Sequence, residues 1–441
     1  MGALDDRRAV IANSRAMPSS VKPSAPMSTS RLRPARACSG RSRSTDRKWH
    51  GLRRYCALSY PSICGAPRLP SVMTTTQVPV LLKDSLGEQR FRTLSDVLHA
   101  IEPAFDREAF LATALDGLGD LTLMERVRRA SVAIDAAARS LPGGYDAVLA
   151  LLQEAAPRLG RGFVSLIAPD YVGQYGRHAF DRSMDALRCF TLFGTSEFGV
   201  REFLRIDTAR ALATMEAWSH DADDAVRRLA SEGSRPRLPW SFRLREIEAD
   251  PALAARILDT LRADPSAYVR RSVANHLNDV AKSHPAWVLD CAERWGDDHP
   301  HTRWIVRHAL RTLVKQGDAR ALAILGAESA PRIAVGPFGV MPAQVALGES
   351  ITLDCELHST VDVAQRLVVD YRIAYVKQNG EASPKVFKLK GLILEPGGRA
   401  TLRHNRAIRD FTTRRHYAGR HEVELIVNGQ VVAQSFFELV V

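Results

Sequence analysis

The segment Val226-Arg227-Arg228-Leu229-Ala230 decides the fold class, because related segments recur twice further along the chain. They are Val269-Arg270-Arg271-Ser272-Val273 and Val306-Arg307-His308-Ala309-Leu310, at intervals of 43 and 37 residues. Such a period is typical of HEAT-like helix pairs, which stack because one pair cannot bury its own apolar face. Helical spacing of alanine and leucine extends over residues 94–326. We therefore predict an all-α HEAT-like repeat solenoid whose concave face suits an extended partner.

A β pattern follows the Gly- and Pro-rich stretch 331–342, which we interpret as a linker. Apolar residues alternate, as in strands with one buried face, in the segments 351–357, 367–376 and 422–427. Asn428-Gly429 is one of several turn signals between such segments. Roughly seven short strands over about 100 residues predict an immunoglobulin-like β-sandwich. The predicted parts are thus a leader (1–72), a helical-repeat domain (73–335) and a sandwich (336–441).

The positive charge of the chain is concentrated in the leader. The sequence has 61 Lys and Arg and 49 Asp and Glu, a net charge of +12, but residues 1–72 alone hold 14 basic residues and 3 Asp. The leader is also rich in Ser, Pro and Ala, so it cannot bury enough surface to fold alone and we predict disorder. It has the composition of an organellar transit peptide; alternatively translation begins at Met73, which we favour. The global charge is therefore weak support for nucleic-acid binding, and local patches have to carry that inference.

Cysteine usage and hydropathy indicate a soluble protein of a reducing compartment. Cys189, Cys291 and Cys355 are far apart and match no zinc or redox spacing, and the other three cysteines lie in the leader. The longest apolar runs are shorter than the ~20 residues of a membrane span. We expect a cytoplasmic monomer with no membrane partner, no metal and no cofactor.

The segment Ser231-Glu232-Gly233-Ser234-Arg235-Pro236-Arg237-Leu238-Pro239-Trp240 is the first candidate binding element. Two prolines fix the backbone on either side of Arg237, and Gly233 precedes them as a helix breaker, which predicts a rigid loop. Arginines beside a tryptophan suit a phosphate backbone with an aromatic plate next to it. The alternative is that Trp240 fills the seam between two helices.

Two acidic residues stand out on either side of this loop. Asp279 falls near the C-terminal end of a predicted helix, the unfavourable half of the helix dipole for a carboxylate. It shares one edge of the helix's apolar stripe with Asn275, one turn earlier and able to hydrogen-bond a carboxylate. The alternative is a solvated Asp at the margin of the stripe. Glu197 follows Thr195-Ser196, and its alternative role is that of an acid in the first turn of a capped helix.

The densest basic patch of the folded part surrounds the loop, with Glu232 as the acid that opposes it. A patch with an aromatic residue among its arginines favours nucleic-acid binding over a solvated helix end. The candidate DNA-binding residues of this patch are Arg227, Arg228, Arg235, Arg237, Arg243 and Arg245, and those of the sandwich are Arg414 and Arg415.

These features resemble the AlkC branch of the AlkC/AlkD-like DNA alkylation repair glycosylases. The resemblance extends from about Met73 to the C-terminus, and the loop 231–240 is its most specific part. The other segments that carry it are Pro169-Asp170-Tyr171-Val172, Tyr175-Gly176, Phe180-Asp181-Arg182-Ser183-Met184, Thr195-Ser196-Glu197-Phe198 and 269–279. The chain has Arg201-Glu202 where Arg-Pro is common in the family, a departure that we do not expect to disturb the site.

The resemblance implies a glycosylase that removes cationic alkylated bases, such as 3-methyladenine, from double-stranded DNA. It further implies that Asp279, Glu197 and Trp240 line the active site. A cationic base leaves as a neutral molecule, so the charge to be stabilised is the one that develops on the deoxyribose. Carboxylates and an electron-rich indole serve that purpose. The alternative is a non-catalytic scaffold that binds DNA or protein, in which these residues only pack and cap.

Overall fold

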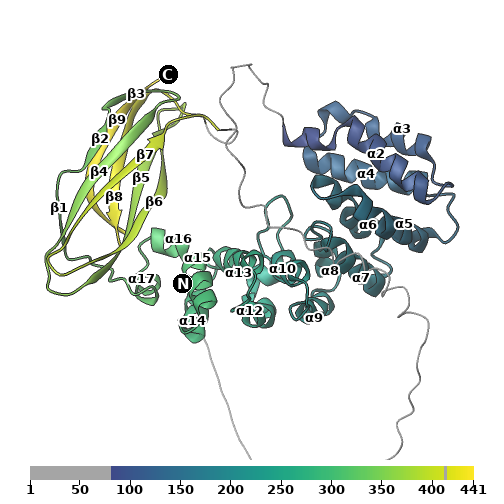
Figure 1. Ribbon diagram of the computed structural model, residues 1–441, viewed down its shortest axis with the longest axis horizontal. Coiled ribbons are helices and arrows are strands. Elements are labelled where there is room, and N and C mark those ends of the chain that lie inside the picture. Colours follow the sequence, from purple (N-terminus) through teal and green to yellow (C-terminus); the bar gives the residue numbers. More distant parts are fainter. Residues whose placement is uncertain (1–80, 412–414) are drawn as a thin grey trace, which may run out of the picture. The chain divides into compact units, whose positions relative to one another are not determined.

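Helices precede strands along the described part of the chain in the computed structural model (Figure 1). It describes residues 81–411 and 415–441, and the predicted leader lies outside them. The order of elements confirms the predicted fold class, a helical-repeat region followed by β-sheets. No helix in these two ranges is both long enough and apolar enough to cross a bilayer.

Sixteen α-helices occupy the described helical part, together with four 3₁₀ turns. The helices are α2 (Glu88–Ile101), α3 (Arg107–Leu115), α4 (Leu123–Ala137), α5 (Gly144–Leu159), α6 (Ile167–Tyr175), α7 (Phe180–Thr191), α8 (Val200–Ile206), α9 (Thr208–Trp218), α10 (Asp224–Gly233), α11 (Arg245–Ala249), α12 (Ala255–Leu261), α13 (Ala267–Val280), α14 (Pro285–Trp295), α15 (Pro300–Ala309), α16 (Arg311–Lys315) and α17 (Ala319–Ile324). The 3₁₀ turns are η1 (Leu82–Leu86), η2 (Leu118–Asp120), η3 (Phe163–Leu166) and η4 (Pro251–Ala254).

The recurring segments lie in α10, α13 and α15, which pack against one another in that order. Figure 1 shows α9, α12 and α14 as a second row beside them, so each repeat is a pair of helices. The first valine of each segment (Val226, Val269 and Val306) is buried in one continuous core. The predicted pairing of helices is therefore correct, and its cause is the shared burial of these apolar stripes.

Nine strands lie in the described residues of the β part. They are β1 (Ile333–Val335), β2 (Gly339–Met341), β3 (Gln344–Ala346), β4 (Ser350–Ser359), β5 (Gln365–Val376), β6 (Ala382–Leu394), β7 (Arg399–Ala407), β8 (Gly419–Val427) and β9 (Gln430–Val440). One sheet has β1, β2 and β7 paired with β4, and the other has the order β3-β9-β8-β5-β6. Tyr371 and Phe437 are fully buried between apolar residues of this part. The turn between β8 and β9 is Asn428-Gly429, both with positive φ, as the sequence predicted.

The interpretation of residues 331–342 as a linker was wrong, because β1 and β2 form within this stretch. Each is only three residues long and pairs with part of β4. Strands this short show no alternation that a sequence pattern can reveal, which also explains why roughly seven strands were expected. The boundaries at 72/73 and 335/336 stay predictions.

Candidate active site

An open pocket of about 410 Å³ lies where three segments of the helical part meet. The segments are 162–166, 194–198 and the loop after α10, joined by Tyr268 of α13. Apolar and aromatic residues line the pocket together with the charged residues Glu197, Arg228, Glu232 and Arg235. The pocket thus offers an aromatic surface close to several fixed charges.

The loop 234–244 begins three residues later than the sequence predicted, because α10 continues through Gly233. Gly233 packs so closely that a Cβ atom there would lie 2.5 Å from Val200 Cγ1. The helix ends at Gly233, and Pro236 keeps it from resuming because a proline disfavours helical geometry in the residue before it, here Arg235. The main-chain N–H of Leu244 donates to the carbonyl of Pro236 at 3.1 Å and closes the loop.

Trp240 stands at the tip of this loop in a strained backbone conformation. Its φ is 64°, in the left-handed region that non-glycine residues rarely adopt. Its side chain is 62% exposed, and its ring centroid lies 6.4 Å from that of Phe163. The alternative in which Trp240 fills a seam between helices is therefore wrong. The indole faces the pocket and the solvent.

Asp279 is buried, with 4% of its surface exposed, so the alternative of a solvated residue at a stripe margin is also wrong. Its Oδ2 accepts a hydrogen bond from Arg235 Nε at 2.8 Å and forms an ion pair with Arg235 Nη2 at 2.7 Å. Its Oδ1 accepts one from Lys282 Nζ at 2.9 Å. No hydrogen bond joins Asn275 to Asp279 in the described residues, and Asn275 Oδ1 accepts from Arg311 Nη2 at 3.0 Å.

Glu197 lies in the segment before α8, and its main-chain N–H donates to Thr195 Oγ1 at 3.3 Å, the bond expected of a Ser/Thr cap. Its Oε2 accepts from Thr195 Oγ1 at 2.9 Å and from Arg228 Nη1. Arg228 also donates to Thr195 Oγ1 at 2.8 Å and stacks its guanidinium over the ring of Tyr268, 5.0 Å from the ring centroid. Arg228 therefore fixes the carboxylate of Glu197 at the wall of the pocket.

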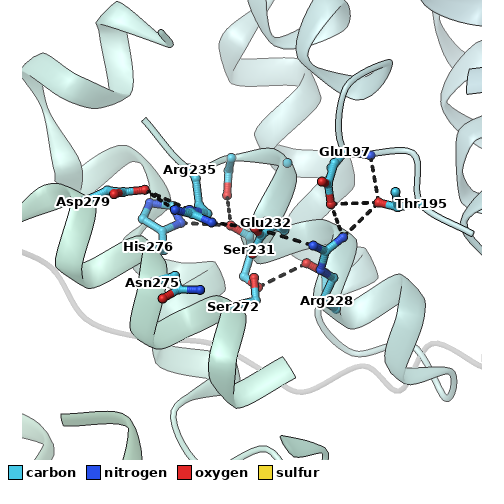
Figure 2. Close-up of polar contacts among 12 residues, drawn as sticks. Thr195, Glu197, Arg228, Ser231, Glu232, Arg235, Ser272, Asn275, His276 and Asp279 are labelled. Carbon is cyan, nitrogen blue, oxygen red and sulfur yellow. Dashed lines mark hydrogen bonds and ion pairs between the residues drawn. The ribbon is translucent and has the colours of Figure 1, made fainter. Parts of the chain in front are cut away.

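Glu232 is the member of the site that the sequence interpretation missed. Its Oε1 lies 2.6 Å from Arg235 Nη1 and 3.5 Å from Arg228 Nη2. The spacing of Arg228, Glu232 and Arg235 by four and three residues at the end of one helix was the signal that could have revealed it. Figure 2 shows the outcome, with Asp279 at one end, Glu197 at the other and Glu232 between the two arginines. We call the six groups Glu197, Arg228, Glu232, Arg235, Asp279 and Lys282 the charge ladder.

Burial and charge act in opposite directions on the cations of this region. Burial lowers the pKa of Arg235, but Glu232 and Asp279 outweigh it, so the net effect is a raised pKa. Burial also lowers the pKa of the fully buried His276 on α13 to about 4, although the carbonyl of Ser231 partly opposes this. His276 is therefore neutral beside the charge ladder at physiological pH.

The structure brings two of the three predicted catalytic residues to the same pocket. Glu197 and Trp240 both line it. Asp279 is not among the described residues that line it, and the guanidinium of Arg235 lies between its carboxylate and the pocket. Asp279 is connected to Glu197 through the charge ladder rather than by a shared surface.

Some of the predicted DNA-binding arginines already form ion pairs within the protein, and others do not. Arg227 is paired with the buried Asp264, and Arg237 with Glu248 and the hydroxyl of Ser283. Arg228 and Arg235 belong to the charge ladder, so phosphate contacts by Arg227, Arg228 and Arg235 would require them to leave these partners.

The remaining candidates are more accessible. Arg243 reaches Glu248 only at 3.4 Å and is largely exposed. Arg245 is exposed and has no ion-pair partner within the described ranges. Arg415 is exposed, and Arg414 lies outside the described residues. Within the parts of the chain that the structure covers, no three His, Cys, Asp or Glu side chains are grouped as a metal site.

Known proteins share this architecture. The family model of the DNA alkylation repair enzymes matches residues 191–313, and the model described as the C-terminal Ig-like domain of the uncharacterised protein YhaZ matches residues 334–441. The uncharacterised protein YhaZ of Bacillus subtilis (strain 168) is 39% identical over 359 residues, which cover 81% of this chain and 99% of YhaZ.

A solved structure adds a functional relative. It is the alkylpurine DNA glycosylase AlkC of Pseudomonas fluorescens, bound to DNA that contains an abasic site analogue. It is 50% identical to this chain with a TM-score of 0.78, and the match covers 82% of this chain and 99% of AlkC. The resemblance noted in the sequence is thereby confirmed. This chain belongs to the AlkC branch of the DNA alkylation repair enzymes.

Proposed function

We propose that this protein is a DNA glycosylase that excises cationic N-alkylated bases, such as 3-methyladenine, by hydrolysing the N-glycosidic bond in double-stranded DNA. The observation that carries the proposal is the pocket that Glu197 and Trp240 line together, although they come from segments 43 residues apart. The 50% identical relative is an alkylpurine DNA glycosylase, which supports the same substrate class.

The charge ladder suits a reaction in which positive charge moves from the base to the sugar. The alkylated base departs as a neutral molecule, so it needs no acid to assist it, and an oxocarbenium-like sugar develops. Three carboxylates held by ion pairs cannot reorient, and fixed charges of this kind stabilise a developing charge without reorganisation. The ladder alternates three carboxylates with three cations and is formally neutral. It therefore does not repel a cationic substrate.

We assign roles by position. The carboxylate of Asp279, held in place by Arg235 and Lys282, stabilises the sugar charge through the electrostatic field of the site. Glu197, already at the pocket wall, shares the electrostatic role. Trp240 presents its electron-rich face to the sugar or the base, an attraction of about 0.5–2 kcal/mol for a cation over a ring. Because water suffices as the nucleophile, we infer a monofunctional enzyme that leaves an intact abasic site.

The test is direct measurement of base release. Duplex DNA treated with a methylating agent is incubated with the protein, and the released bases are identified by mass spectrometry, with strand cleavage followed on a labelled duplex. We expect 3-methyladenine in the supernatant and uncut strands. Folded protein that binds duplex carrying an abasic site analogue yet releases no methylated base would instead support a DNA-binding scaffold.

A further inference from the structure

Arg201 of α8 is the largest fully buried side chain in the described part of the protein, with 0% of its surface exposed. It is neither a lining residue of the pocket nor a member of the charge ladder. No carboxylate lies within ion-pair distance of it in residues 81–411 or 415–441, and its Nε has no hydrogen-bond partner. A cation in such a place is unusual, since an unpaired buried charge is strongly unfavourable.

The hydrogen bonds of Arg201 all lead to the main chain around the loop 234–244. Its Nη1 donates to the carbonyls of Gly233 at 3.0 Å and Arg235 at 2.6 Å, and its Nη2 donates to the carbonyl of Phe242. The first two carbonyls precede Trp240 in the chain and the third follows it. One planar, rigid guanidinium therefore connects the chain segment before Trp240 with the segment after it. A lysine ammonium cannot form these bonds with the same geometry.

The loop has a specific need for such a support. The positive φ of Trp240 is a strained conformation, and strain of this kind persists only where the surroundings enforce it. Exposed as it is, the indole has few contacts of its own to hold it. The carbonyl that Arg201 holds at Arg235 belongs to the same residue whose side chain binds Asp279 and Glu232. By holding the loop, Arg201 thus positions both the indole of Trp240 and the Arg235 side chain that binds Asp279 and Glu232.

Nearby carboxylates help the buried Arg201 to stay protonated. Burial, together with the positive charge of Arg235, lowers the pKa of Arg201 to about 10, while Glu197, Asp279 and Glu232 oppose that change from a distance. The guanidinium therefore keeps its charge at physiological pH.

We propose that Arg201 is a positioning residue, which holds the loop 234–244 and with it Trp240 and Arg235 in the geometry that the pocket requires. The role in excision rests on the proposed glycosylase activity, whereas the role in holding the loop does not depend on it.

The experiment compares Arg201→Lys and Arg201→Met with the wild type, and uses Arg126→Lys as a matched control. Arg126 of α4 is also a buried arginine that donates to main-chain carbonyls, those of Leu121 at 3.2 Å and Lys83 at 2.7 Å, but it supports a different part of the fold. Hydrogen exchange of the DNA-free full chain is followed by mass spectrometry for the loop and for α13. Single-turnover excision and affinity for duplex with an abasic site analogue are measured in parallel.

We expect Arg201→Lys to raise the exchange rate of the loop amides about tenfold while α13 stays as protected as in the wild type. Excision should fall about 100-fold, the size of effect that a small misplacement of reacting groups produces, with little change in affinity. Arg126→Lys should leave loop exchange and excision unchanged. If Arg201→Met does not fold, the lysine variant carries the test alone.

Two results would overturn the proposal: loop exchange equal to that of the wild type, or equal loss of protection in the loop and in α13, which would make Arg201 a general packing residue. A wild-type protein that releases no methylated base would refute the proposed function instead, and the exchange measurement would still decide the role of Arg201.

Discussion

Replacing Asp279 with asparagine keeps the shape of the side chain and removes one negative charge from the charge ladder. The three carboxylates Glu197, Glu232 and Asp279 balance Arg228, Arg235 and Lys282, so the variant site carries one uncompensated positive charge. For a charge about 6 Å from a developing sugar cation and an effective dielectric constant of about 20, Coulomb's law gives a barrier increase of about 3 kcal/mol, or ~100-fold in rate. The variant should therefore bind DNA and excise slowly.

The Asp279→Asn variant should also lose stability, and this loss has to be separated from its loss of excision rate. Asp279 accepts two charge-assisted hydrogen bonds, from Arg235 Nε and Lys282 Nζ, but Arg235 keeps Glu232 and Lys282 is partly exposed, so the loss should be about 2 kcal/mol of unfolding free energy. Asp264→Asn is the matched control, because Asp264 is another buried carboxylate paired with an arginine of α10. It should lose similar stability in urea unfolding and keep its excision rate.

The assay is single-turnover release of 3-methyladenine with enzyme in excess over methylated duplex, beside anisotropy titrations with an abasic site analogue. A rate for Asp279→Asn equal to that of the wild type would refute the assignment of Asp279. Equal losses of rate in Asp279→Asn and Asp264→Asn would refute the electrostatic reasoning and point to stability alone.

Three further predictions concern packing, charge and pH. Gly233→Ala should lose about 1–3 kcal/mol of unfolding free energy in urea, because its Cβ would lie 2.5 Å from Val200 Cγ1, whereas Gly119→Ala has open space and should not. Arg245→Ala should lower the slope of log affinity against log salt by about 1 if it binds one phosphate, and an unchanged slope would exclude that contact. The neutral His276 should make unfolding free energy fall between pH 6.5 and about 4, because the unfolded chain binds the proton first. Up to about 3 kcal/mol is involved, and His276→Gln should flatten this part of the pH profile in urea unfolding.

The fold could be predicted from the sequence because its signals are local. The apolar spacing around Val269 and Val306 reports on the helix that contains it, and the Asn428-Gly429 turn reports on its own hairpin. The three-residue strands β1 and β2 could not be predicted from their own sequence, because they form only by pairing with the distant strand β4.

The internal partners of the site could not be predicted in the same way. A helical wheel of α13 placed Asp279 at the edge of an apolar stripe, but Arg235 covers it from a segment 44 residues away. Asn275 was assigned to Asp279 because the two are one turn apart, whereas its actual partner is Arg311. Arg201 gave no local signal, since its bonds run to carbonyls more than 30 residues away. Polar pairing over such separations depends on tertiary packing, which periodicity does not encode.

The alternation of charge in the ladder has a consequence for how ionic strength should act on this protein. Its guanidinium and carboxylate groups are largely buried, so dissolved ions reach them poorly, while accessible arginines such as Arg243 and Arg245 are fully subject to screening. Added salt should therefore slow the capture of DNA and shorten its residence, yet leave the turnover of lesions already in place nearly constant. DNA binding would then depend on the salt concentration, whereas the rate of base excision would depend on the buried ion pairs.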